Sequence, residues 1–338
     1  MDIHTIGVIG DGAWGTALAL LLNDSGYSVR IWGYFSDYID HMKRTRENTK
    51  FLPGPHIPES ILLTDDMAEC IGSAGLVILA VPSHVMRQTC LSLKDTIRVT
   101  GTEPVAITVS KGIENKTLLR MSEVINDVLP QLDVAVLSGP THAEEVAVGI
   151  PSVAVAAGTS LELSEMVQSI FSTDRFRVYT GDDMVGVEIG GALKNIIAVA
   201  AGISDGLGFG DNTKAALITR GLAEMTRLGV AMGAKPMTFA GLSGMGDLIV
   251  TCTSRHSRNR GLGEKIGSGM TLRQVSQTME KVAEGVKTVC SAVELAKKYS
   301  VDMPIASKVY EILYEDRNAM EAFSELMDRP LRREPDFV

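Results

Sequence analysis

The chain has 338 residues, of which 45% are hydrophobic and 22% charged, and its formal net charge is −9. This length suffices for two domains, the composition excludes a largely disordered chain, and the negative charge argues against a nucleic-acid partner. No basic leader precedes the first strand-like run, and Glu188, Lys194 and Asn195 interrupt the most apolar segment, so we expect a cytoplasmic protein without membrane insertion. The four widely spaced cysteines predict neither a disulfide framework nor a metal site.

Short strand-like runs alternate with helical stretches up to about residue 180. The sequence predicts strands at residues 6–9, 28–32, 61–64, 76–81, 105–110, 134–138, 152–157 and 176–180. Continuous apolar strands separated by helices are typical of a largely parallel sheet covered on both faces. We therefore predict a doubly wound α/β domain over residues 1–184.

Beyond Gly181 the β-branched clusters thin out, and Ala, Leu, Met, Glu and Lys recur at helical spacing, as in residues 213–233. This pattern predicts an all-helical C-terminal domain over residues 185–338. Ligands commonly bind between domains, so we expect the substrate in the cleft between these two.

A glycine-rich loop, GDGAWG at residues 10–15, follows the first strand and opens a helical run, and a second strand begins near Ser28. Gly10, Gly12 and Gly15 permit a tight turn and close backbone approach, while the helix N-terminus offers free N–H groups to a pyrophosphate. The strand, loop, helix and strand together predict a Rossmann-type dinucleotide site.

The second strand and the residues after it read IWGYFSD at 31–37. No carboxylate stands directly at the strand end, where an NAD-selective site would hold the ribose 2′-hydroxyl. A 2′-phosphate is not repelled there, which favours NADP(H). Asp37 could still reach back to the ribose, so the expected cofactor is NADP(H) or NAD(H).

One lysine, Lys194, lies at the centre of the apolar run at residues 185–203. A buried ammonium is costly unless it is paired or used in chemistry. The alternative is a lysine whose stem covers apolar surface while its charge reaches water. Lys111 follows the fifth predicted strand, at the sheet edge where ligands bind, or is a solvated loop lysine. Residues 138–143 follow the sixth predicted strand and lie at the same sheet edge. A lone histidine beside a loop, such as His142, more often has a structural role than a catalytic one.

Two polar segments interrupt the helical half, at residues 244–247 and 254–260. The serine, arginine and asparagine of residues 257–260 are the donors that a phosphate needs, which predicts an anion site; the alternative is a solvated basic helix start. Asp247 could orient Lys194 or a substrate hydroxyl, or cap a helix.

The chain also carries, in order, GDGAWGTALA, FLPGPHIP, AVPS, SKGIE, SGPTHAEEVA, GALKNIIAVAAGISDGLGFGDNTKAALITRGLAEM, GMGDLIVTC, SRNR and EGV. This series resembles the bacterial NAD(P)-dependent glycerol-3-phosphate dehydrogenases over essentially the whole chain. The resemblance implies interconversion of sn-glycerol 3-phosphate and dihydroxyacetone phosphate, run mainly as ketone reduction for phospholipid synthesis, by a homodimer.

The same resemblance implies that Lys194 is the catalytic residue. It assigns substrate contacts to Lys111, Gly139, Thr141, Lys194, Asp247, Ser257, Arg258 and Asn259. It assigns cofactor contacts, beside those of the loop glycines, to Ala13, Trp14, Tyr34, Lys111, Ala143, Arg258, Val282 and Glu284. Three positions depart from the family pattern: Ala13 and Thr141 replace a frequent serine, and Tyr34 replaces histidine or arginine, which bears on any 2′-phosphate contact.

In this reaction a hydride reaches the ketone carbon, and protonated Lys194 stabilises and protonates the developing alkoxide. Oxidation needs the neutral amine, which is favoured by burial or by a second cation such as Lys111. Two alternatives remain: a 6-phosphogluconate- or 3-hydroxyisobutyrate-type dehydrogenase, and a non-catalytic NADP(H)-sensing protein with the same fold.

Overall fold

The computed structural model describes residues 3–278, 283–331 and 333–334. The chain forms two compact units, one of Met1–Ser110 and Met121–Met184 and the other of Lys111–Arg120 and Val185–Val338. Residues 111–120, which the sequence division assigned to the first domain, therefore belong to the second unit.

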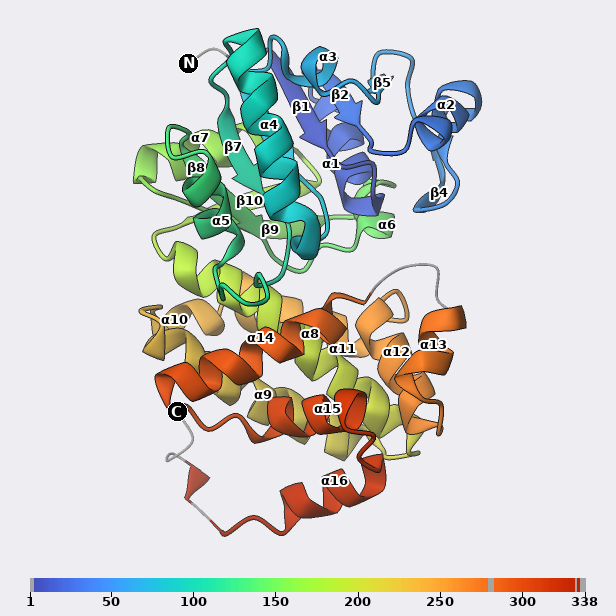
Figure 1. The fold of residues 1–338 in the computed structure, drawn as a ribbon, viewed down its shortest axis with the longest axis vertical. Helices are drawn as coiled ribbons and strands as arrows, with labels where there is room; N and C mark the ends of the chain where they lie inside the picture. Colours follow the sequence, from blue (N-terminus) through green and yellow to red (C-terminus); the bar gives the residue numbers. More distant parts are fainter. Residues whose placement is uncertain (1–2, 279–282, 332, 335–338) are drawn as a thin grey trace. The chain divides into compact units, whose positions relative to one another are not determined.

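The first unit is built on an eight-stranded sheet in the order β10-β9-β8-β7-β6-β1-β2-β5 (Figure 1). Its strands are β1 (Thr5–Ile9), β2 (Ser28–Trp32), β5 (Leu62–Thr64), β6 (Leu76–Leu79), β7 (Val105–Thr108), β8 (Val134–Ser138), β9 (Ser152–Gly158) and β10 (Phe176–Gly181). From β5 to β8 all pairs are parallel, in the Rossmann order, whereas β9 runs antiparallel to β8. The predicted strands and the largely parallel sheet are confirmed.

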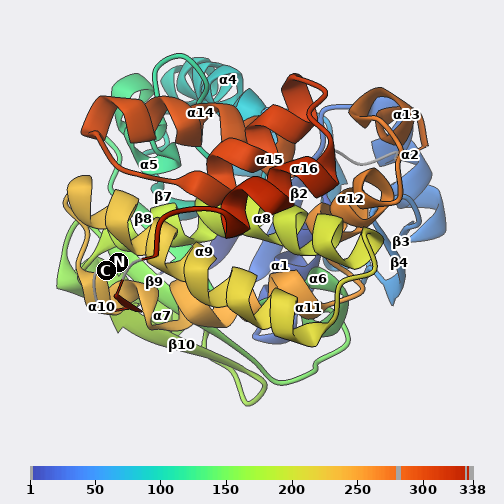
Figure 2. The ribbon, with the colours of Figure 1, turned by 90° about the horizontal axis from the view of Figure 1, so that it is seen from below.

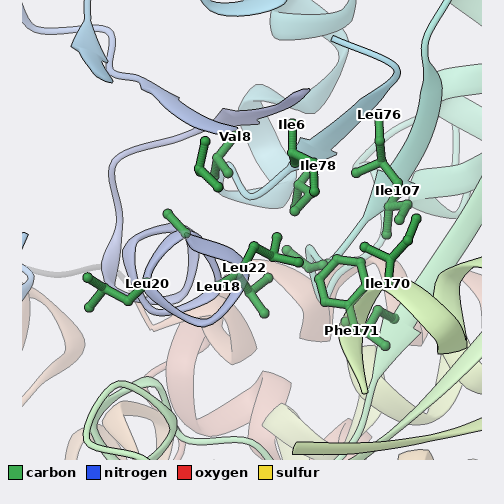
Figure 3. Packing of buried hydrophobic residues seen from close by; sticks show 14 of the residues in the cluster. Ile6, Val8, Leu18, Leu20, Leu22, Leu76, Ile78, Ile107, Ile170 and Phe171 are labelled. Carbon is green, nitrogen blue, oxygen red and sulfur yellow. The ribbon is translucent and has the colours of Figure 1, made fainter. Parts of the chain in front are cut away.

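Helices cover both faces of this sheet because right-handed crossovers run outward from β1 in both directions. The helices α1 (Ala13–Asp24), α6 (Ala143–Val146) and α7 (Leu161–Phe171) pack together on one side, and α3 (Met67–Ile71), α4 (Met86–Thr100) and α5 (Met121–Val128) on the other. Figure 3 shows Leu18 and Leu22 of α1 and Phe171 of α7 against Ile6 and Ile78 of the sheet. This packing fixes the start of α1 at the end of β1.

One part of the first unit escaped prediction. After α2 (Ser36–Thr45), β3 (Glu47–Asn48) and β4 (Leu52–His56) form an antiparallel hairpin. The sequence of β4, LPGPH, contains two prolines and a glycine, which are depleted in strands and confined to edges. The hairpin is nevertheless anchored, because Asn48 is buried and bonds to the glycine loop.

Apart from residues 111–120, which form a loop closed by an isolated bridge between Ile113 and Arg120, the regular elements described in the second unit are all helices (Figure 2). It comprises α8 (Met184–Gly206), α9 (Asp211–Ala231), α10 (Pro236–Phe239), a π-helical turn (Leu242–Gly246), α11 (Asp247–Thr253), α12 (Arg258–Gly267), α13 (Leu272–Thr278), α14 (Glu284–Tyr299), α15 (Pro304–Tyr314) and α16 (Ala319–Met327). The expected helical half is confirmed.

The central helix of this unit is α8. Within the described part of the chain it is the one helix long and apolar enough to cross a membrane, but 83% of its apolar window is buried inside the protein, as in a core helix. Its backbone touches that of α12: a Cβ added at Gly202 would lie 2.0 Å from the Arg260 oxygen, and one at Gly263 would lie 2.1 Å from the Val199 oxygen. The glycines thus bring the start of α12 against the middle of α8.

Candidate functional site

The glycine loop of the first unit has the geometry of a pyrophosphate cradle. Gly10 has a φ of +122°, which favours glycine, and a Cβ at Gly15 would lie 2.1 Å from the Gly10 oxygen. At Gly12, by contrast, an added Cβ would meet no atom within 4 Å. One glycine thus makes the turn, another lets α1 pack closely, and Gly12 leaves open space at the N-terminus of α1, so the residues fit a dinucleotide.

Three further predicted cofactor residues surround this loop. Ala13 is the first residue of α1, and Trp14 is half-buried with its ring centroid 6.4 Å from that of Phe176. Ala143, the first residue of α6, is buried in a small cluster with Ala17, next to which Ala13 and Trp14 pack. The structure therefore brings Ala13, Trp14 and Ala143 together at the glycine loop.

Tyr34 follows β2 and is 74% exposed. Its ring meets that of Trp32 at 6.3 Å and that of Phe35 at 5.1 Å between centroids, both edge to face. The result is an exposed aromatic surface at the carboxyl end of β2, where the adenosine half of a dinucleotide binds in this fold.

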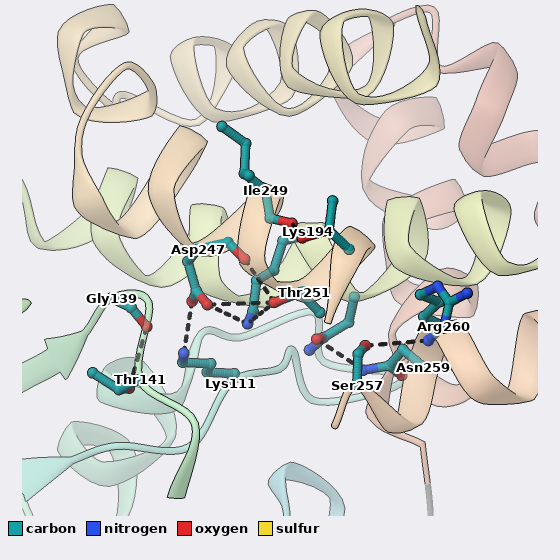
Figure 4. A network of polar contacts seen from close by, with 12 residues as sticks. Lys111, Gly139, Thr141, Lys194, Asp247, Ile249, Thr251, Ser257, Asn259 and Arg260 are labelled. Carbon is teal, nitrogen blue, oxygen red and sulfur yellow. Dashed lines mark hydrogen bonds and ion pairs between the residues drawn. The ribbon is translucent and has the colours of Figure 1, made fainter. Parts of the chain in front are cut away.

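Gly139 and Thr141 lie in the loop after β8. Gly139 has a φ of +150°, and a Cβ there would lie 2.9 Å from the Ala154 Cα atom, so this turn requires glycine. The Thr141 hydroxyl donates to the Gly139 oxygen at 3.2 Å (Figure 4). The loop is therefore rigid, and His142 ends it as the residue before α6.

Within the second unit, Asp247 bridges two lysines (Figure 4). Its Oδ1 atom lies 2.5 Å from Lys194 Nζ and its Oδ2 atom 2.6 Å from Lys111 Nζ. Lys194 also donates to the Thr251 hydroxyl at 2.7 Å, and that hydroxyl donates to the Asp247 carbonyl oxygen at 2.6 Å. We call Lys111, Lys194, Asp247 and Thr251 the lysine cluster. Lys194 is therefore a paired buried cation and not a lysine that reaches water.

Burial lowers the pKa of Lys194 from 10.5 to about 8. Desolvation of the ammonium is the main cause, and the nearby charge of Lys111 lowers the pKa further, whereas Asp247 opposes the shift. An amine with this pKa can give or take a proton near neutral pH, which is the property that an acid–base group needs.

Lys111 reaches the cluster because residues 111–120 are held on the helical unit. Arg120 of this segment forms an ion pair with Glu188 of α8, and the Ser291 hydroxyl of α14 donates to Asn115 at 2.5 Å. Ile113 is buried in the helical core. The segment thus leaves the sheet after β7 and delivers its lysine to Asp247.

The predicted anion site lies at the start of α12. Ser257 caps this helix by accepting from the Arg260 N–H at 3.2 Å, as the helix-start alternative expected. Arg258 is the exposed first residue of α12, whereas Arg260 is paired with Asp205 at 2.7 Å. The buried Asn259 amide donates to Asn195 at 2.9 Å. The N-terminus of α12 and the guanidinium of Arg258 provide positive potential for an anion, although the cap occupies the Arg260 N–H.

Asn195, the neighbour of Lys194 on α8, ties this helix start to the lysine cluster. Asn259 also accepts from the Gly285 N–H at 2.9 Å, which brings in the first turn of α14, where Glu284 begins the helix. Val282 lies outside the described residues, so its predicted cofactor contact stays a prediction.

The second unit thus gathers Lys111, Lys194, Asp247, Ser257, Arg258, Asn259 and Glu284, while the first carries Gly10, Gly12, Ala13, Trp14, Gly15, Tyr34, Gly139, Thr141 and Ala143. Sequence reasoning missed Thr251 and Asn195. Thr251 is four residues beyond Asp247 on one helix, and this spacing was the available signal. In the described ranges, no group of three or more His, Cys, Asp or Glu side chains is arranged to hold a metal ion, and none of the four cysteines is joined in a disulfide.

Comparison with known proteins agrees with this geometry. Models of the N-terminus and the C-terminus of NAD-dependent glycerol-3-phosphate dehydrogenase match residues 5–164 and 183–324. The chain is 50% identical to a glycerol-3-phosphate dehydrogenase (NAD(P)+) of Chlorobium phaeobacteroides over 332 residues, which are 97% of this chain and 98% of that protein. It is 51% identical to the enzyme of the same name from Citrifermentans bemidjiense over the same shares of both chains.

A crystal structure of glycerol-3-phosphate dehydrogenase from Coxiella burnetii matches 97% of this chain and 99% of its own with a TM-score of 0.93 and 38% identity. A dinucleotide-binding sheet followed by a helical unit with a buried lysine is the arrangement of the two-domain, nicotinamide-dependent dehydrogenases. The chain belongs to the NAD-dependent glycerol-3-phosphate dehydrogenase family. These matches favour this family over the 6-phosphogluconate and 3-hydroxyisobutyrate types and over a non-catalytic sensor.

Proposed function

We propose that the protein interconverts sn-glycerol 3-phosphate and dihydroxyacetone phosphate, with Lys194 as the group that moves the proton. The observation that carries this proposal is the lysine cluster: an ammonium buried in an apolar helix, bonded to Asp247 and Thr251, with a pKa lowered to about 8. NADH or NADPH supplies the hydride when bound.

In ketone reduction, the ammonium of Lys194 donates a hydrogen bond to the carbonyl oxygen and then the proton that completes the alcohol. In the reverse reaction the neutral amine accepts the hydroxyl proton. Asp247 fixes the position of the amine and stabilises its protonated form, whereas Lys111 favours the neutral form. Together with desolvation, which is the main cause of the shift, these two neighbours set the pKa of Lys194 to about 8, so the amine can give or take a proton near neutral pH.

The phosphate of the substrate would bind at the start of α12. Arg258 can fork onto two phosphate oxygens, and the first N–H groups of α12 point at the same anion. The hydrogen bond from Asn259 to Asn195, the neighbour of Lys194, joins the start of α12 to α8. The distance between the bound phosphate and the carbonyl group would therefore be set by two helices. Gly139 and Thr141, on the loop after β8, are the remaining proposed substrate contacts.

Nucleotide binding is proposed for the first unit, over residues 1–184. Gly10, Gly12 and Gly15 would carry the pyrophosphate, and the aromatic surface at Tyr34 the adenosine half, with Ala13, Trp14, Lys111, Ala143, Arg258, Val282 and Glu284 as further contacts. Residues 185–338, with the segment at 111–120, would carry the substrate and the chemistry.

We further propose that the enzyme works mainly in the reductive direction, that it is cytoplasmic, and that it acts as a homodimer. The reductive direction and the homodimer follow from the family resemblance, and the cytoplasmic location is supported by the burial of α8, the one described helix long and apolar enough to cross a membrane.

The deciding experiment follows the absorbance of reduced nicotinamide with dihydroxyacetone phosphate as substrate. We expect rapid oxidation of the reduced nucleotide, a much slower reaction with dihydroxyacetone, and no reverse reaction with 6-phosphogluconate or 3-hydroxyisobutyrate. Nucleotide binding without turnover of any of these would instead favour a sensor.

A further inference from the structure

The carboxylate of Asp11, in the glycine loop, lies beside Gly33 at the end of β2. Gly33 follows the last residue of β2, about 20 residues beyond the glycine loop, where the fold places the acidic residue that holds the ribose 2′-hydroxyl. A Cβ added at Gly33 would lie 2.5 Å from Ile39 Cδ1 and 2.9 Å from both Cγ and Oδ2 of Asp11. The strand therefore has no carboxylate at this residue, and the carboxylate of Asp11 lies next to it.

Asp11 is held there by the β3–β4 hairpin. The buried Asn48 amide donates to the Asp11 carbonyl oxygen at 2.7 Å and to the Thr16 hydroxyl at 2.7 Å. This side chain ties the hairpin to the second residue of the glycine loop and to the first turns of α1. The carbonyl group of Asp11 is thus held by the hairpin.

The Asp11 side chain itself still has an unused acceptor. Its Oδ2 atom is shielded from solvent and has no hydrogen-bond partner within the described ranges, while the residue as a whole is only half-buried. Burial raises the pKa of this carboxyl. A buried acceptor without a donor is unfavourable, and a carboxylate turns readily about its last torsion, so a ribose hydroxyl would be a favourable partner.

Charges around the end of β2 act against a 2′-phosphate. The exposed Asp65 carboxylate follows β5, the neighbour of β2, and accepts from the Ser36 side chain, which lowers the pKa of Asp65. The cation facing Asp11 is Lys50, whose exposed ammonium lies 5.1 Å from the centroid of the Phe51 ring. A 2′-phosphate would bring a charge of about −1.5 to −2 beside Asp11.

We propose that Asp11 sets the cofactor preference of this enzyme, by accepting a hydrogen bond from the ribose 2′-hydroxyl of NADH and repelling the 2′-phosphate of NADPH. This inference rests on the proposed function and reverses the preference for NADP(H) that the missing strand carboxylate favoured. It also gives Tyr34 a consistent place, because a site that binds no 2′-phosphate needs no basic residue there.

The test measures binding of NADH and NADPH directly, from the fluorescence of the reduced nicotinamide, with the full-length protein. We expect the wild type to bind NADH at least about tenfold more tightly, which corresponds to about 1.4 kcal/mol. Asp11→Asn keeps the size of the side chain but removes its charge, so NADPH should gain affinity, NADH should lose some, and the ratio should approach one. Asp37→Asn, at an exposed carboxylate of the same region, is the matched control and should keep the wild-type ratio.

Three results would overturn the inference: a wild type that binds NADPH as tightly as NADH, an Asp11→Asn variant with an unchanged ratio, or a collapse of the ratio in Asp37→Asn instead. Asp11→Ala, with a melting temperature checked against wild type, repeats the test if Asp11→Asn folds poorly. Lys50→Met tests the opposite possibility, that this site binds the 2′-phosphate of NADPH. Loss of NADPH binding in that variant would identify Lys50 as a 2′-phosphate ligand. Failure of the proposed function is distinguishable, because it would show as binding of NADH with no turnover of dihydroxyacetone phosphate.

Discussion

The glycine loop of the first unit and the lysine cluster of the second are built in opposite ways. Six consecutive residues make the loop, and its chemistry resides in backbone N–H groups and in the absence of side chains. The cluster joins Asp247 to Lys194, 53 residues away, and to Lys111, 136 residues away. The geometry of a local motif follows from its own residues, whereas a cluster of distant residues forms only when the helices that carry them pack together.

The two regions also differ in what burial costs. The loop has few side chains, so a ligand can approach its backbone, and the hydrogen bonds that it offers come from backbone N–H groups. The lysine cluster gathers a buried and a half-buried ammonium group around one buried carboxylate, and desolvation shifts the pKa of Lys194. Damage to the loop should therefore appear in packing and nucleotide binding, and damage to the cluster in catalysis.

The largest expected effect breaks the cluster at Lys194. Lys194→Met keeps an unbranched apolar stem in the core but removes the amine, so kcat should fall by about 10²–10⁴, the usual worth of a positioned acid–base group. NADH binding and the helical circular dichroism should stay at wild-type levels. Lys297→Met, at an exposed lysine in the last turn of α14, is the control and should keep full activity. A wild-type kcat in Lys194→Met would end the assignment.

The next effect separates the anion site from the lysine cluster within the same unit. Arg258→Ala should raise KM for dihydroxyacetone phosphate by about 10- to 100-fold, because a charge-assisted hydrogen bond contributes about 1.5–3 kcal/mol. The reaction with dihydroxyacetone, which lacks the phosphate, should change little. Arg255→Ala removes another exposed guanidinium of the same polar segment and should leave both substrates unaffected. Equal losses for both ketones would refute phosphate binding by Arg258.

Two glycine variants test whether the loop acts through packing or through nucleotide binding. Gly15→Ala places a methyl 2.1 Å from the Gly10 oxygen and should lower the free energy of unfolding by about 1–3 kcal/mol together with NADH affinity. Gly12→Ala adds its methyl to open space and should leave the melting temperature unchanged, yet weaken NADH binding by obstructing the pyrophosphate. Calorimetry and nucleotide titration measure both quantities. Full NADH affinity in Gly12→Ala would contradict the proposed cradle.

The smallest effect concerns the pH dependence of the cluster. Since Lys194 has a pKa of about 8, kcat for glycerol 3-phosphate oxidation should rise with pH through about 8, and kcat for ketone reduction should fall over the same range. Thr251→Val removes an acceptor that stabilises the ammonium. The inflexion should move down by about half a unit to one unit, since one hydrogen bond is worth about 0.5–1.5 kcal/mol. An unmoved inflexion would show that Thr251 does not act on Lys194.

Much of the fold could be predicted from the sequence because its strands and helices follow from short-range patterns of residues. The eight strands of the main sheet and the helical second half follow from apolar runs and helical spacing. The β3–β4 hairpin was missed because prolines and a glycine hide its strands, and residues 111–120 were assigned to the wrong unit because the contacts of Arg120 and Asn115 are with distant helices.

The sequence by itself determined the largely parallel sheet, the glycine loop and the place of Lys194 within an apolar run, since each depends on neighbours within a few residues. Only the tertiary structure decided that Asp247 bridges two lysines, that Asn195 joins the start of α12 to α8, and that the Asp11 carboxylate lies beside Gly33. The physical reason is that hydrogen bonds, ion pairs and pKa shifts depend on distances of a few ångströms between residues far apart in the chain. Those distances are fixed by packing, which no local pattern records.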